Sequence, residues 1–190
     1  METGQKYFIL IVFAFLHIYN VCVANVKWQA RPISISKNTT DPNYMDLNVK
    51  IERFGQGEFA FTGTYFTTIE MDESVTVELR IYSCYSGNEA DYKLTPYSIQ
   101  PQKFIDYLNT FYKDLLMKNL GDCTDLPKYE DGYVPPWPKG TFNFTRCQIS
   151  GEGMPEVVPE GFYKALVIIS ALPAVELQFT VILKVTTKMF

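Results

Sequence analysis

Alternation of apolar and polar residues runs through most of the chain and predicts antiparallel β-strands, each with one buried and one solvated face. Strand-like runs occupy residues 26–36, 47–52, 59–65, 75–82, 141–149 and 175–185. Residues 161–171 are apolar on both faces. That pattern predicts a central strand covered on both sides.

One segment, about residues 100–120, has helical spacing instead. Its apolar residues recur at intervals of three, four and one: Phe104, Ile105, Leu108, Phe111, Tyr112, Leu115 and Leu116. Pro101 suits the first turn of such a helix, and Gly121 stands where a C-terminal cap belongs. The Gly- and Pro-rich residues 121–140 follow as a long loop, and loops of this length are usually functional or mobile.

The predicted order is therefore about five strands, one helix, a long loop and three more strands. We expect a mainly β fold, built as a two-layer antiparallel sandwich with the helix at one edge. If the sheets splay apart at one end, the inner aromatic side chains line a cup instead of a solid core. No internal repeat or linker interrupts residues 25–190, so a single domain is expected there.

The N-terminus has the pattern of a secretory signal peptide. An apolar run at residues 7–16 precedes small residues at the −3 and −1 positions of a cleavage site after Ala24. The alternative is an uncleaved membrane anchor, which is disfavoured because His17 and Asn20 interrupt the run before the ~20 residues that a span needs. We expect removal of residues 1–24 and an extracellular protein.

The charge and the side-chain chemistry exclude several classes of function. The formal net charge is −4 and no basic run is present, which argues against nucleic acid as a partner. The only histidine, His17, leaves with the signal peptide, and with it go the commonest general base and metal ligand. We expect no catalytic residue, metal or cofactor. The remaining enzyme hypothesis is glycoside hydrolysis by carboxylate pairs, Glu130 with Asp131 or Glu152 with Glu156, although acids in such loops are usually just solvated.

Three cysteines remain in the mature chain: Cys84, Cys123 and Cys147. A bridge between Cys123 and Cys147 is expected, because both lie in or beside connecting sequence, and it would stabilise the fold by about 3.5 kcal/mol. Cys84 is then a buried thiol or an intermolecular partner. The alternative, three reduced thiols, fits poorly with an oxidising secretory route.

Two glycosylation sequons begin at Asn38 and Asn143. Asn38 precedes a polar turn, whereas Asn143 falls inside a strand pattern, where a glycan requires an outward-facing side chain. By strand alternation Cys147 shares the face of Asn143. A bridge at Cys147 is therefore expected to lie outside the cup.

The candidate cup lining consists of inner-face aromatic and aliphatic residues. They are Phe59, Phe61, Tyr65, Val77, Leu79, Phe111, Trp137 and Phe179. For each of them, ordinary core packing is the alternative. Trp137, held among prolines in the long loop, is the best candidate for a mobile flap at the mouth of the cup.

Several stretches carry a resemblance to a known family when they are taken in order along the chain. They are residues 49–60, 76–82, 91–93, 111–114, 123–127 and 155–164. The last contains Pro155-x-x-x-Pro159-x-Gly161-Phe162-Tyr163, the most telling of them. Over nearly its full length the chain resembles the insect CheB-type chemosensory proteins, which are distantly similar to the ganglioside-activator protein and to ML-like lipid-recognition proteins.

This resemblance implies an apolar β-cup that holds a lipid-like molecule. It further implies a role in perceiving contact chemicals such as cuticular hydrocarbons, with a membrane chemoreceptor or ion channel as a second partner. The competing hypothesis is a secreted adhesion or receptor-partner module with a filled core, which would use the loop 121–140 as its contact surface.

Overall fold

The computed structural model describes residues 26–171 and 174–188, so the predicted signal peptide 1–24 lies outside the described residues. The strands are β1 (Trp28–Thr39), β2 (Met45–Arg53), β3 (Phe59–Thr67), β4 (Thr76–Cys84), β5 (Lys93–Leu94), β6 (Ile99–Lys103), β7 (Gly140–Cys147), β8 (Gly161–Ala171) and β9 (Val175–Thr187). A short 3-10 turn spans Glu89–Asp91. Within the described part of the chain, no helix has the length and hydropathy of a membrane span.

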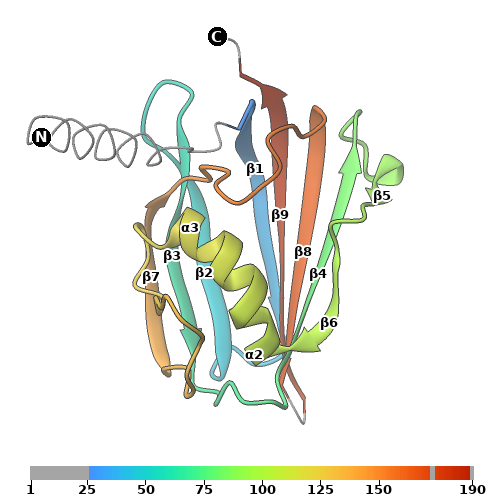
Figure 1. Ribbon diagram of the computed structural model, residues 1–190. Coiled ribbons are helices and arrows are strands. Elements are labelled where there is room, and N and C mark those ends of the chain that lie inside the picture. The colour runs from blue at the N-terminus through green and yellow to red at the C-terminus, as the bar shows by residue number, and fades with distance from the viewer. Residues whose placement is uncertain (1–25, 172–173, 189–190) are drawn as a thin grey trace, which may run out of the picture.

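The strands form two antiparallel sheets, as the alternation predicts. The larger sheet has the order β1-β9-β8-β4-β5, with β6 also pairing with β4, and the smaller one has the order β2-β3-β7. The sheets approach each other where β1 neighbours β2, and a helix lies between β7 and β4 (Figure 1). The predicted mainly β, two-layer antiparallel fold with one helix is confirmed, as an open sandwich and not a closed barrel.

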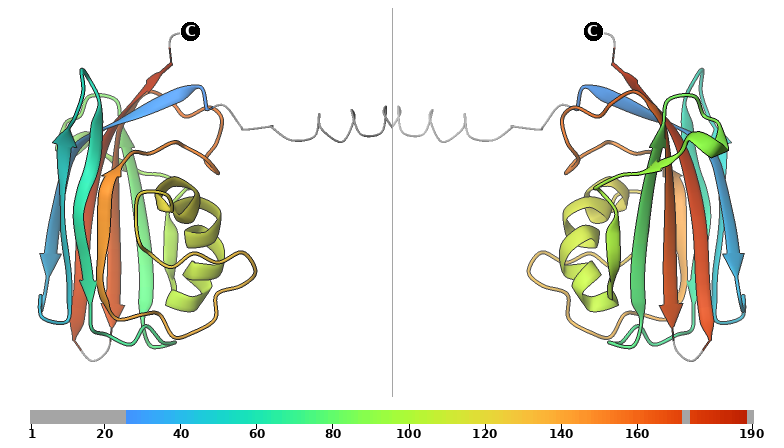
Figure 2. Two further views of the ribbon diagram at one scale, coloured as in Figure 1. Left: turned by 90° about the vertical axis from the view of Figure 1, so that its left-hand side faces the viewer. Right: turned by 90° about the vertical axis from the view of Figure 1, so that its right-hand side faces the viewer.

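The helix is continuous from Phe104 to Leu120. It consists of α2 (Phe104–Tyr107), a π-helical segment (Leu108–Leu116) and α3 (Met117–Leu120). Its buried face is formed by Phe104, Leu108 and Tyr112, at the four-residue spacing that predicted the helix. Figure 2 shows it lying along one side of the two sheets.

The start of the helix differs from the prediction. Pro101 lies in β6 and not in a first helical turn. Because β6 is an edge strand that pairs only with β4, the missing N–H of Pro101 can be tolerated there. The short strands β5 and β6 bring the number of strands before the helix to six.

The main hydrophobic core, called here the core cluster, fills the end of the sandwich where β8 and β9 are connected. Its buried members are Met45, Leu47, Met71, Val75, Val77, Phe104, Leu108, Tyr112, Trp137, Phe142, Ala171 and Leu177. They come from both sheets, the helix and the loop after it. This end of the interior therefore holds most of the buried apolar side chains.

A second, smaller cluster closes the opposite end. Val26, Trp28 and Val185 are buried there, and Met154 and Val158 pack against them. The Trp28 indole Nε1 donates a hydrogen bond to the carbonyl oxygen of Pro155 at 2.9 Å. The segment before β8 thus folds over the start of β1.

Residues 161–171 form a central strand, as predicted, but it is not covered on both sides. β8 lies between β9 and β4. Its inward residues Val167 and Ile169 pack on the core cluster. Leu166 and Ile168 point the other way and are half-buried, and Figure 2 (right) shows no helix over this outer face.

Candidate functional site

Between the two clusters, the inner face of the larger sheet carries apolar side chains that belong to neither. These residues, called here the middle region, are Leu79, Ile81, Ala165, Val181 and Leu183. The strand register aligns them, because Ile81 pairs with Ala165 and Ala165 pairs with Val181. All five are half-buried.

This partial exposure is found on strands that are paired on both sides. β4, β8 and β9 each have paired strands on both sides, so neighbouring backbone protects their edges. The inward side chains of these strands in the middle region are nevertheless partly exposed. The aliphatic middle region is therefore a surface that a small apolar molecule could cover.

The facing sheet contributes aromatic and aliphatic groups at the same level. Phe61 is 8% exposed and pairs across the strands with Ile51, and neither belongs to a core cluster. Phe59 lies at the edge of this region, where the Arg31 guanidinium sits 4.4 Å above its ring.

The predicted lining residues therefore fall into three groups. Phe61 and Leu79 border the space between the clusters. Val77 is 1% exposed and lies inside the core cluster, and Tyr65 and Phe179 pack against it. Phe111 is 37% exposed and faces away from the core.

Trp137 lies in the core and not in an exposed flap. It is 3% exposed, and its ring meets those of Phe104 and Tyr112 edge-on at centroid distances of 5.3 and 5.5 Å. Tyr133 and Phe142 contact it at 5.9 and 6.1 Å. One side chain of the long loop thus joins the helix to β7.

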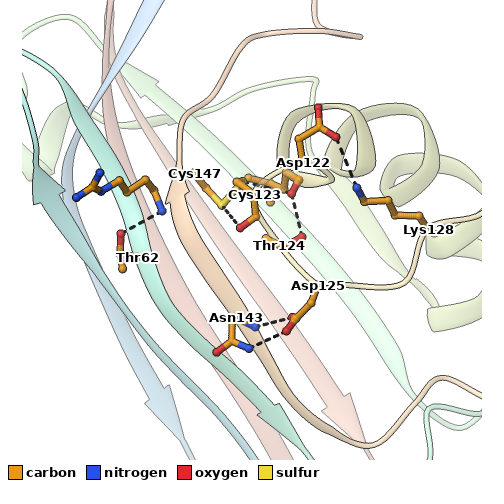
Figure 3. Close-up of a disulfide and its surroundings, with 10 residues drawn as sticks. Thr62, Asp122, Cys123, Thr124, Asp125, Lys128, Asn143 and Cys147 are labelled. Carbon is orange, nitrogen blue, oxygen red and sulfur yellow. Dashed lines mark hydrogen bonds and ion pairs between the residues drawn. A yellow bond between two sulfur atoms is a disulfide. The ribbon is translucent and has the colours of Figure 1, made fainter.

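The loop between the helix and β7, residues 121–139, is a strap tied down at several points. A disulfide links Cys123 to Cys147 as predicted (Figure 3). The Tyr112 hydroxyl donates to the carbonyl oxygen of Pro127 at 2.6 Å, and the Tyr129 hydroxyl donates to that of Leu108 at 2.5 Å.

The disulfide lies on the opposite strand face from the one that alternation predicts. Arg146 has a positive φ of 53°, and the register between β3 and β7 shifts there, so that Cys147 pairs with Phe61. Asn143 pairs with Thr64 and faces outward. The bulge reverses the alternation, so the expectation that Cys147 shares the face of Asn143 is wrong.

The strap also carries an aromatic cluster that the sequence analysis did not identify. Tyr112 stacks on Tyr129 at 5.9 Å, and Tyr129 contacts Tyr133 at 5.5 Å. Tyr129, Tyr133 and Trp137 recur at every fourth residue, as do Phe104, Leu108 and Tyr112 in the helix. This matched four-residue spacing was the feature of the sequence that could have predicted the aromatic cluster. It was missed because the strap was expected to be an irregular loop.

Burial raises the pKa values of the tyrosines in this cluster. The pKa of Tyr129 rises to about 12, first because the hydroxyl is desolvated and second because Tyr133 lies nearby. The pKa values of Tyr107 and Tyr112 also rise, again mainly through desolvation. The site therefore favours neutral groups.

The other candidate chemistry is dispersed on the surface. Glu130, Asp131, Glu152 and Glu156 are exposed, and Glu156 forms an ion pair with Lys27 at 2.9 Å. Within residues 26–171 and 174–188, no group of three or more His, Cys, Asp or Glu side chains could hold a metal ion. Cys84 is a buried thiol at the end of β4 with no disulfide partner among the described residues.

No residue of the middle region lines either of two open clefts in the described part of the chain. One of about 320 Å³ follows the seam between β1 and β2, where Ile35, Leu47 and Val49 are flanked by polar side chains such as Lys37. The other, about 420 Å³, lies where β8 and β9 are connected and has Ser74, Thr76 and Glu176 among its walls.

The disulfide should contribute measurably to stability. Replacing both Cys123 and Cys147 by Ser should lower the free energy of unfolding by about 3.5 kcal/mol, because the bridge closes a loop with a sequence separation of 24. Denaturant melts of the double variant and of Cys84→Ala, which keeps the bridge, would measure this. Equal midpoints for the double variant and the wild type would contradict the prediction.

The tyrosine cluster should make the fold sensitive to alkali. A raised pKa means that the folded state favours the neutral phenol over the phenolate. The contribution of these tyrosines to the free energy of unfolding is therefore fully present below pH ~10 and is lost as the pH rises through the folded-state pKa of about 12. In an alkaline pH titration followed by tyrosinate absorbance, a fraction of the tyrosines should ionise only at the higher pH at which the protein unfolds. Tyr129→Phe should reduce that fraction, whereas Tyr85→Phe, at an 87% exposed position, should not.

Comparison with known proteins gives one family match. A family model described as "Protein of unknown function (DUF1091)" matches residues 75–165, just under half of the chain. The matched segment contains β4, the helix, the strap, the disulfide and the first half of β8. A search of curated proteins found no match.

Proposed function

We propose that this protein is a secreted, non-enzymatic binder of a hydrophobic small molecule that acts in chemosensory perception. The observation that carries the proposal is the half-buried aliphatic middle region, which lies between two packed ends. Covering these partly exposed side chains with an apolar molecule would remove further apolar area from water, which favours binding.

The energetics are sufficient for reversible binding. Burying a hydrocarbon chain is worth about 0.8 kcal/mol per CH₂ group, or about 8 kcal/mol gross for ten carbons. Association costs reduce this to micromolar or weaker affinity. No catalytic group has to take part, so a carrier can work through shape and apolar area alone.

The finer identity rests on the resemblance to the CheB-type proteins. Most of the stretches that carry it, including residues 76–82 and 123–127, fall inside the segment matched by the family model. A pheromone or cuticular-hydrocarbon-like ligand, and a membrane chemoreceptor or ion channel as a second partner, belong to this proposal.

Extracellular location is part of the same proposal. It is supported by the disulfide and by the two sequon asparagines, which are exposed in β1 and β7. The Asn143 side chain donates to Asp125 at 2.7 Å through the nitrogen that would carry the glycan.

Both sequons should be modified when the protein is secreted from insect cells. Enzymatic deglycosylation should lower the mass by two glycans. The variant Asn38→Gln should lack one of these two mass decreases, and Asn143→Gln should lack the other. A secreted protein whose mass deglycosylation leaves unchanged would contradict this expectation.

A second candidate is an adhesion or receptor-partner module with a filled core. Two observations favour it: the solid core cluster and the uncovered outer face of β8, where Leu166 and Ile168 are half-buried. In that case the small gaps of the middle region would be packing defects and not a ligand site.

The substitution Ala165→Phe separates the two candidates. Ala165 points into the middle region, whereas its neighbour Leu166 points outward, so Leu166→Phe is a matched control on the same strand. For a carrier, Ala165→Phe should fold with nearly unchanged stability and should lose the lipid-sized mass seen by native mass spectrometry. The control should keep that mass.

A filled core makes the opposite prediction. The wild type would carry no added mass, and Ala165→Phe would overpack the interior and lower the free energy of unfolding by about 1–3 kcal/mol. This outcome would reject the carrier function.

A further inference from the structure

Around the core cluster, three buried side-chain atoms have no hydrogen-bond partner among the described residues. They are Trp137 Nε1, the Tyr133 hydroxyl and Gln102 Nε2. The rings of Trp137 and Tyr133 are neighbours at 5.9 Å, and Gln102 lies opposite the core residue Val77. All three groups can donate a hydrogen bond, so what they lack is an acceptor.

This shortage is specific to these groups. The other tryptophan, Trp28, donates to Pro155, and two tyrosines of the same aromatic cluster, Tyr112 and Tyr129, donate to backbone carbonyl oxygens. Buried donors in native proteins are nearly always paired. A strap that satisfies its other polar groups and leaves adjacent donors unpaired therefore suggests that a ligand supplies the acceptor.

The surroundings select a neutral acceptor. Among the described residues, Thr67 is the only polar or charged residue that is buried. An ionised carboxylate would thus enter without a cation to pair with, which is strongly unfavourable in an apolar interior. The carbonyl oxygen of an ester, aldehyde or ketone accepts hydrogen bonds without carrying charge.

The strand pair β4–β8 connects the core cluster to the middle region. Val167 packs against the core cluster that contains Trp137, and its pairing partner on β4 is Leu79. A ligand that ran from the core cluster along this strand pair would lie over the half-buried residues of the middle region.

We propose, on the basis of the carrier function above, that the ligand is a neutral oxygenated aliphatic molecule whose carbonyl accepts a hydrogen bond from the Trp137 indole. A plain hydrocarbon would leave the Trp137 and Tyr133 donors unpaired. Trp137 therefore acts as a specificity-determining residue, and the middle region supplies apolar contact.

The test compares an ester with an alkane of equal size: methyl dodecanoate and pentadecane have the same number of heavy atoms, and only the ester carries a hydrogen-bond acceptor. A third probe, dodecanoate, is ionised at neutral pH and tests whether a charged acceptor is disfavoured. Their dissociation constants are measured by displacement of an apolar fluorescent dye from the delipidated, full-length secreted protein. The ratio of the ester and alkane dissociation constants is compared between variants, because the general hydrophobic contribution to binding cancels in it.

Removing the donor should erase the preference for the ester. In Trp137→Phe the affinity for the ester should fall about tenfold relative to the affinity for the alkane. Trp28→Phe is the matched control, because its indole is already paired, and it should keep the wild-type ratio. Tyr133→Phe, which removes only a hydroxyl, should shift the ratio in the same direction. Dodecanoate should bind more weakly than the ester to the wild type.

A second readout does not depend on how well Trp137→Phe folds. The chain has two tryptophans, so Trp137 is the sole indole fluorophore of Trp28→Phe. Its emission should respond differently to the ester and to the alkane. Equal emission with both probes, or an unchanged ratio in Trp137→Phe and Tyr133→Phe, would overturn the inference while leaving the carrier function intact. If no probe displaces the dye, the carrier function fails and the inference falls with it.

Discussion

The contact on which much of this structure depends is the insertion of Trp137 among the rings of Phe104, Tyr112 and Phe142. These rings come from the helix and from β7, so one side chain holds three segments together. The helix also meets the strap through the stacked rings of Tyr112 and Tyr129. The Cys123–Cys147 bridge secures the start of the same strap covalently.

Filling one end of the sandwich in this way has a consequence for the rest of the interior. The core cluster draws its largest side chains from the helix and the strap, while the inner face of the larger sheet farther along offers mainly Leu, Ile, Val and Ala. The aliphatic surface of the middle region is left half-buried because the bulky groups are concentrated elsewhere.

Much of the fold could be predicted because it depends on local periodicity. The alternation at residues 75–82 and 175–185 became β4 and β9, and the four-residue spacing of Phe104, Leu108 and Tyr112 became the buried face of the helix. The orientation of Cys147 could not be predicted, because the positive φ of Arg146 inserts a bulge that alternation does not reveal. The burial of Trp137 was missed for a related reason: Phe104 and Tyr112, the helix residues that its ring meets edge-on, are distant from it in sequence.

By itself, the sequence determined the class of the protein: antiparallel strands, one amphipathic helix, a disulfide beside the long connection and no histidine after His17. These properties follow from near-neighbour patterns and from composition, which do not depend on how elements meet. Only the tertiary structure decided which apolar residues fill the core and which stay half-buried. It also decided which donors have acceptors, because both outcomes depend on contacts between strands, helix and strap that lie far apart along the chain.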